Sequence, residues 1–166
     1  MIQILKDSDT RPWFFLQTAH TTYGMWVMET GHLEHLYYGE RITVDLQDPS
    51  SCAPLVIQRA FAPGNTCTYD REHPQISMED VCLEVGTLGK GDIREPFLEV
   101  RFADGSVTSD FTFDSYEIIT LKEREQCLQD SGLPHSYSEV GTDSAECLQI
   151  VLQDVTNHLE LQLFYT

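Results

Sequence analysis

At 166 residues the chain has the length of a single domain, and a domain of this size buries about 70% of the surface that its unfolded chain would expose. Its 41% hydrophobic and 22% charged residues are typical of a globular protein and argue against a disordered one. The 10 basic and 27 acidic side chains give a net charge of −17, which repels nucleic acid and anionic membranes, whereas neutral sugars remain compatible ligands.

The start of the chain and its cysteines bear on its compartment. In residues 1–7 charged side chains follow after only a few apolar ones, so this segment is too short in apolar residues for a signal peptide or a membrane span. We therefore expect a cytoplasmic protein. The five cysteines are widely spaced, without a Cys-x-x-Cys pair. This spacing favours reduced thiols over a disulfide framework or a zinc knuckle.

Strand patterns dominate the first forty residues or so. Aromatic and β-branched side chains alternate with polar ones over residues 13–18, 22–29 and 32–38, a period that is typical of half-buried strands. Gly31 lies between the second and third of these segments and can provide the turn of a hairpin. We therefore expect an antiparallel pair here.

The middle of the chain, residues 39–96, has a different composition. Five prolines and several glycines interrupt it, which predicts long loops with short strands. One helical turn is expected near residues 77–83, with Ser77 as its N-cap and Asp80 as the acidic residue at the third helical position.

Regular alternation returns in the second half. Residues 97–103 and 107–113 flank Asp104-Gly105 and predict a hairpin. Residues 115–122 alternate again, a polar stretch follows over 123–134, and residues 145–153 and 158–165 predict a last hairpin. Repeated hairpins without long helices indicate an all-β fold, an antiparallel β-sandwich with few or no helices.

Catalytic patterns are weak throughout the sequence. His32 and His35, the closest pair of histidines, would point to opposite faces of a strand and could not share a metal ion. Nucleophile elbows, phosphate loops and dinucleotide fingerprints do not occur, and the abundant carboxylates single out no catalytic pair. We therefore expect no catalytic residue, no metal and no cofactor in this chain.

Residues 89–96 alternate charges between flexible glycines and a proline, a pattern of functional loops and of loops that contact a neighbouring domain. Sugar sites combine aromatic faces with amide, carboxylate or guanidinium groups, and most aromatic residues here fit strand cores instead. The loop residues that remain as candidates are Gln58, Arg59, Tyr69 and Arg71.

Several segments carry a resemblance to a known family. They are Phe15-Leu16-Gln17-Thr18, residues 31–39, Arg59-Ala60-Phe61, residues 91–96, Ala103-Asp104-Gly105-Ser106, Gly132-Leu133-Pro134 and Leu159-Glu160-Leu161. Through these collinear segments the sequence resembles the N-terminal part of bacterial α-galactosidases of glycoside hydrolase family 36.

The resemblance implies a large N-terminal β-supersandwich, then a (β/α)₈ barrel and a small C-terminal β-domain. The barrel supplies both catalytic carboxylates for hydrolysis that retains the anomeric configuration, and it is absent from this chain. Residues 1–166 are accordingly expected to form the first part of the supersandwich and to be inactive alone.

The resemblance also implies partners: the barrel of the same protein, and further copies of the chain, since the family is commonly tetrameric. In such tetramers N-terminal loops of one subunit can help to wall the galactose pocket of another. The matching positions are Gln58, where many relatives have an acidic residue, Arg59, and Arg71 of an Asp-Arg pair.

The favoured hypothesis is therefore an accessory domain of an α-galactosidase that acts on terminal α-galactosides such as melibiose or raffinose. Two alternatives remain at this point. One is a free-standing carbohydrate-binding or lectin-like sandwich, and the other is a metal-dependent enzyme on a β-sandwich, for which the histidine spacings give little support.

Overall fold

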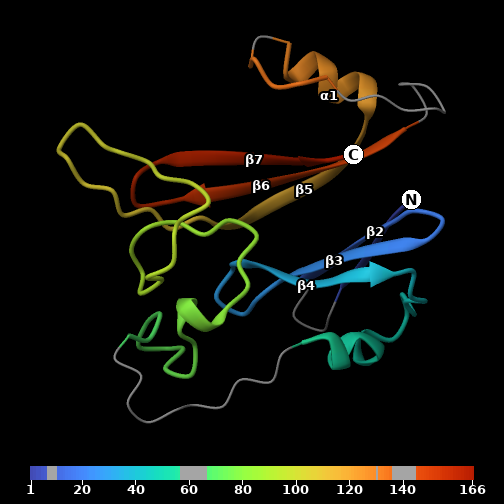
Figure 1. Cartoon of the computed structure of the whole chain (residues 1–166), viewed down its shortest axis with the longest axis horizontal. Coiled ribbons are helices and arrows are strands. Elements are labelled where there is room, and N and C mark those ends of the chain that lie inside the picture. Colours follow the sequence, from blue (N-terminus) through green and yellow to red (C-terminus); the bar gives the residue numbers. More distant parts are fainter. Residues whose placement is uncertain (7–10, 57–66, 130, 136–144) are drawn as a thin grey trace.

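Alternating side chains and tight turns produce two antiparallel sheets that face each other (Figure 1). The structure, a computed structural model, describes residues 1–6, 11–56, 67–129, 131–135 and 145–166. One sheet has four strands in the order β1-β2-β3-β4, the other three in the order β5-β6-β7. The strands are β1 (Ile2–Lys6), β2 (Pro12–Gln17), β3 (Thr21–Val27), β4 (Leu33–Glu40), β5 (Thr112–Thr120), β6 (Glu146–Asp154) and β7 (Leu159–Tyr165). The predicted antiparallel β-sandwich is thus confirmed.

The main core lies between the sheets, because every second side chain of each strand points inward. Phe14 and Met25 of the first sheet are fully buried there, together with Leu148 and Ile150 of β6. Tyr116 of β5 contacts the Phe14 ring edge-on, with ring centroids 5.2 Å apart. The two sheets therefore stabilise each other through their apolar faces.

The first sheet is covered on its outer face as well. Trp13 and Phe15 point away from the second sheet and pack with Cys52 of the 3₁₀ helix η1 (Pro49–Leu55). Trp13 also contacts Trp26, with ring centroids 4.7 Å apart. A third apolar cluster joins the end of β3 to residues 76–81, which include the short 3₁₀ helix η2 (Met78–Asp80).

The strands predicted over residues 13–18, 22–29, 32–38 and 115–122 correspond to β2, β3, β4 and β5, and the last predicted hairpin to β6 and β7. The predicted turn near 77–83 is η2. Ser77 occupies its N-cap position, but its side chain makes no capping hydrogen bond.

The hairpin predicted over residues 97–113 is wrong. A turn does form at Asp104-Gly105, where the Phe102 N–H donates to the Ser106 carbonyl at 2.9 Å. The flanking residues, however, bond to a distant segment: the Leu98 N–H donates to Gly86 and the Ser109 N–H to Leu88. Residues 97–110 consequently run beside residues 86–88 and form none of the strands named above.

Three elements were not expected from the sequence: β1, η1 and the α-helix α1 (Leu121–Cys127). The N-terminus of α1 is fixed by a capping box, in which Thr120 accepts from the Glu123 N–H and Glu123 accepts from the Thr120 N–H. The helix lies on the outer side of the second sheet (Figure 1). Its place explains why Cys147 on the outer face of β6 is fully buried.

Candidate functional site

Residues 67–110 gather at one end of the sandwich, and both termini lie at the other (Figure 1). Of the predicted site residues, Gln58 and Arg59 lie outside the described residues. Arg71 is described, and its side chain is exposed. The loop end of the sandwich is therefore where the predicted site can be tested against the geometry.

Arg71 lies in a tightly bonded turn, residues 69–76, which we call the Arg71 turn. The Tyr69 N–H donates to the Ile76 carbonyl at 2.8 Å and closes the turn. Inside it, the Asp70 carboxylate accepts from the N–H groups of Glu72 at 2.8 Å and His73 at 2.7 Å, as Asp does in an Asx turn. Arg71 is thus an exposed side chain on an ordered backbone.

Beneath the turn lies a set of polar side chains that we call the Asp110 network. It consists of Thr30, His32, Tyr69, Lys90 and Asp110. The carboxylate of Asp110 accepts from the Tyr69 hydroxyl at 3.0 Å and lies 3.0 Å from the Lys90 ammonium and 2.9 Å from His32 Nε2. The other ring nitrogen of His32 lies 2.9 Å from the Thr30 hydroxyl. Three separate segments of the chain therefore meet on one carboxylate.

The network shifts the pKa values of Asp110 and Tyr69. Burial of Asp110 by itself would raise its pKa, but the hydrogen bonds and positive charges of His32 and Lys90 outweigh burial and lower this pKa to about 2. Burial, followed by the negative charge of Asp110, raises the pKa of Tyr69 well above its usual value. At neutral pH the carboxylate is ionised and the phenol is neutral, which is the pairing that their hydrogen bond requires.

The glycine-rich loop predicted as functional contributes to this end of the molecule. Its backbone is left-handed at Lys90 (φ 57) and Gly91 (φ 87), and a Cβ on Gly91 would lie 2.5 Å from Cys67 Sγ. Arg94 bonds to the carbonyls of Met78 at 2.9 Å and Val81 at 2.7 Å. The basic side chains of the loop therefore attach it to neighbouring segments of the same chain, and Ile93 is left 84% exposed at its surface.

A second polar cluster, on Glu84, links the two sheets. Glu84 accepts hydrogen bonds from the hydroxyls of Tyr23 on β3 and Tyr165 on β7, and His35 Nδ1 lies 3.3 Å from its carboxylate. Burial and the neighbouring Glu84 raise the pKa of both tyrosines far above the usual value. No sequence pattern pointed to Glu84, because its partners are 61 and 81 residues away.

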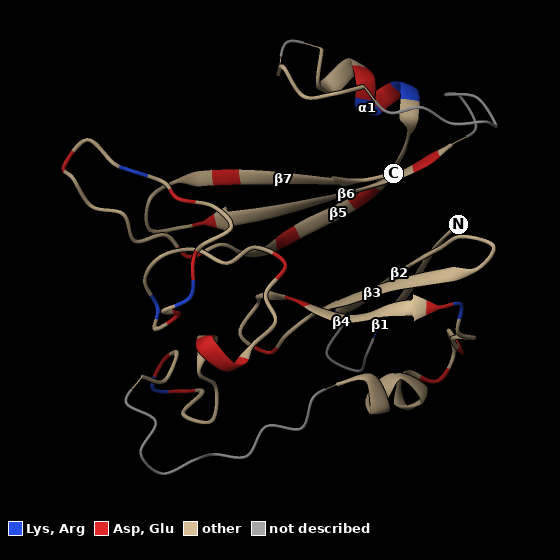
Figure 2. Ribbon diagram, viewed as in Figure 1, with Lys and Arg blue, Asp and Glu red and all other residues tan. Residues whose placement is uncertain are grey.

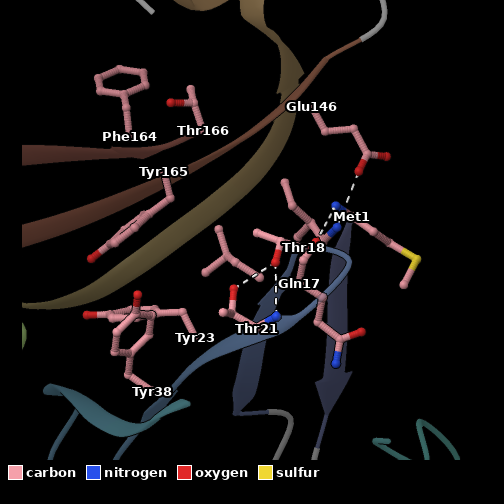
Figure 3. Close-up of a pocket in the computed structure, with 12 residues that line it drawn as sticks. Met1, Gln17, Thr18, Thr21, Tyr23, Tyr38, Glu146, Phe164, Tyr165 and Thr166 are labelled. Atoms are coloured by element: carbon pink, nitrogen blue, oxygen red, sulfur yellow. Dashed lines mark hydrogen bonds between the residues drawn. The ribbon is translucent and has the colours of Figure 1, made fainter. Parts of the chain in front are cut away.

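Next to this cluster an open cavity of about 690 Å³ lies between the sheets, at the end where the termini are (Figure 3). Figure 3 shows the ring of Tyr165 pointing down toward Tyr23 and Tyr38, with Thr18 and Thr21 beside them. The volume lies within the range of small-molecule sites. Rings and hydroxyls line the cavity together with the Glu146 carboxylate, which gives it the chemistry of a site for polar ligands.

Acidic residues predominate over the described part of the chain, and they are not grouped into a metal site. Figure 2 shows acidic segments spread over both sheets and the loops, with few basic segments among them. No three His, Cys, Asp or Glu side chains in this part of the chain are placed to hold a metal ion. Nor does it contain a helix long and apolar enough to cross a membrane.

Comparison with known proteins identifies the family. The model of the glycosyl hydrolase family 36 N-terminal domain matches residues 31–166. The bifunctional α-galactosidase/sucrose kinase AgaSK of Mediterraneibacter gnavus is 35% identical over 153 residues, which cover 92% of this chain and 15% of that protein. The α-galactosidase AgaA of Geobacillus stearothermophilus is 31% identical, over 92% of this chain and 19% of that protein.

Solved structures agree with the sequences. The galactosidase domain of AgaSK superposes with a TM-score of 0.73 at 30% identity and covers 98% of this chain and 21% of its own. A complex of an AgaA variant from Geobacillus stearothermophilus with raffinose gives a TM-score of 0.73 at 27% identity, over 92% of this chain and 20% of that one. The chain thus spans about a fifth or less of the relatives that it matches, and it belongs to glycosyl hydrolase family 36, where it corresponds to the N-terminal portion.

Proposed function

We propose that this chain is the non-catalytic N-terminal β-sandwich portion of an α-galactosidase that hydrolyses terminal α-D-galactosides such as melibiose and raffinose with retention of configuration. The observation that carries the proposal is the family match over residues 31–166. Relatives are named α-galactosidases, and most of their length lies outside the region they share with this chain. We assign the catalytic carboxylates to a barrel domain of that remaining length.

The first role that we propose is packing against the barrel domain and against other copies of the chain, in a homo-oligomer such as a tetramer. Ile93 and Phe97 support this role, since they are 84% and 77% exposed beside a loop that Arg94 holds in place. Exposed apolar side chains on a fixed backbone are suited to an interface. We place the protein in the cytoplasm, which agrees with five free cysteines.

The second role is to shape the mouth of the active site, with Gln58, Arg59 and Arg71 as substrate-binding residues. Arg71 supports this assignment because its exposed guanidinium is carried by an ordered turn. A guanidinium offers several N–H donors in one plane and can bind two sugar hydroxyls at once.

Kinetics test the non-catalytic assignment of this chain and its substrate-binding role. The 166-residue chain alone should not hydrolyse an α-galactoside, whereas the full-length protein should. In the full-length protein Arg71→Ala should raise KM for melibiose about tenfold, the loss expected for one charged hydrogen-bonding group. Arg101→Ala is the matched control, since the Arg101 side chain is 72% exposed in another loop. Hydrolysis by the isolated chain would contradict the proposal.

The cavity between the sheets favours one alternative, a carbohydrate-binding module that acts without a barrel. This alternative requires saturable binding of galactose or melibiose by the 166-residue chain in isothermal titration. Tyr38→Ala should then abolish the heat, because Tyr38 lines the cavity and is 71% exposed, whereas Phe97→Ala should not. A folded sample that gives no heat with either sugar would rule out the module.

A further inference from the structure

The Asp110 network lies directly under the Arg71 turn, and no role in sugar binding follows for it from the family match. Its carboxylate is 17% exposed and receives hydrogen bonds or ion pairs from three segments of the chain. A buried carboxylate with this many donors is costly to disturb, because each lost partner leaves charge without compensation. The network is therefore a rigid support for the turn that is attached to it.

The backbone of Asp110 is fixed to the second sheet. The Asp110 N–H donates to the Asp154 carboxylate at 3.1 Å, and Asp154 is 1% exposed at the end of β6. On the opposite side, His32 belongs to the turn between β3 and β4 of the first sheet. Asp110 is thus held in a defined place relative to both sheets.

Tyr69 connects this support to the Arg71 turn. Its hydroxyl donates to Asp110, the His32 ring meets its ring edge-on with centroids 4.8 Å apart, and the Lys90 ammonium lies 5.4 Å from its centroid. The side chain is consequently held at its tip and on its ring. Its backbone N–H closes the turn onto Ile76, and Arg71 follows two residues later.

We infer that Tyr69 is a positioning residue for sugar binding, which acts through Asp110 to hold Arg71 in the geometry that a galactoside requires. This inference rests on the proposed role of Arg71. Tyr69 itself does not contact the sugar in this scheme. Removal of the Tyr69 hydroxyl does not remove the Arg71 guanidinium, but it loosens the turn, so that the guanidinium occupies a wider range of positions. Sugar binding then weakens, while the chemical step is preserved.

Four forms of the full-length enzyme test the inference with melibiose: wild type, Tyr69→Phe, Arg71→Ala and the double variant. Tyr69→Phe should raise KM about threefold to tenfold and leave kcat within about twofold, as expected for one hydrogen bond that supports binding alone. In the double variant Tyr69→Phe should add nothing to the effect of Arg71→Ala, because its effect passes through Arg71. Tyr37→Phe is the matched control, since the Tyr37 hydroxyl donates to the Glu40 carbonyl at 3.0 Å on β4.

The outcomes separate the two proposals. If Arg71→Ala leaves KM unchanged, the role of Arg71 is wrong and the role of Tyr69 falls with it. If Arg71→Ala raises KM and Tyr69→Phe does not, only the positioning role is wrong. An equal rise of KM from Tyr69→Phe with and without Arg71 also overturns it, because the effect would then bypass Arg71.

Discussion

Replacement of Asp110 by Asn should destabilise the fold in a way that depends on pH between about 5 and 2. The pKa of Asp110 falls from 3.8 in the unfolded chain to about 2 in the fold, a difference equivalent to about 2 kcal/mol of stability. Solvent screening at the exposed part of the carboxylate reduces this figure to about 1 to 2 kcal/mol. The folded-state pKa is the lower one, so the contribution is complete above about pH 5 and disappears as the pH falls through 2.

Urea denaturation of wild type and Asp110→Asn at half-unit steps from pH 6 to pH 3 measures this contribution directly. The difference in unfolding free energy should be largest at pH 6 and should shrink to about half at pH 3. Titration of the other carboxylates cancels in the comparison. Asp114→Asn removes the same charge from an exposed position on β5 and reports the effect of charge alone. A difference for Asp110→Asn that stays constant from pH 6 to pH 3 would refute the reasoning.

Three further predictions concern the core, the helix and the buried groups. Ile150→Ala should cost about 2 to 5 kcal/mol of unfolding free energy, whereas Ile118→Ala should cost about 1 kcal/mol or less, because Ile150 is fully buried and Ile118 is 44% exposed; similar losses would contradict the placement of the core. Thr120→Ala should remove about 1 kcal/mol by breaking the capping box of α1, as measured by urea denaturation, and an unchanged midpoint would argue against the cap. In a spectrophotometric titration the last tyrosines to ionise should be the ones whose pKa is raised by burial and a nearby carboxylate, namely Tyr23, Tyr69 and Tyr165; complete ionisation of all the tyrosines near pH 10 would contradict the hydrogen bonds to Glu84 and Asp110.

Strand positions were predictable wherever burial alternates along the chain. In β6 the inner residues Leu148, Ile150 and Leu152 are buried and the outer residues between them are partly exposed, so the period of two is visible in the sequence. Residues 97–110 show the limit of this reasoning. Leu98 and Val100 pack against the core, which imposes alternation, but their segment bonds to residues 86–88, a pairing that no local pattern specifies.

The short helix α1 could have been found. Thr120 and Glu123 have the spacing of a capping box, and this signal is independent of helix length. The seven residues of the helix are too few for a clear apolar stripe. The polar composition of this segment alone therefore favoured a loop in place of α1.

The candidate site was predictable only in part. Tyr69 and Arg71 were identified as loop residues with suitable chemistry, but the support beneath them was not. Asp110 lies 41 residues from Tyr69 and 78 from His32, and only the folded chain brings these groups together.

The order of the strands has a consequence for how the chain folds. Each sheet pairs strands that are consecutive in the sequence. The first sheet and the β6–β7 pair can form from local hairpins with short loops, whereas β5 pairs with β6 across residues 121–145. The contacts that join the sheets are distant, such as Glu84 with Tyr165 at a separation of 81 residues, and their loop-closure entropy opposes early docking. We therefore expect docking of the sheets to follow the transition state. Tyr165→Phe should then accelerate unfolding and leave the folding rate nearly unchanged in a chevron analysis, whereas a slower folding rate would place the docking step earlier.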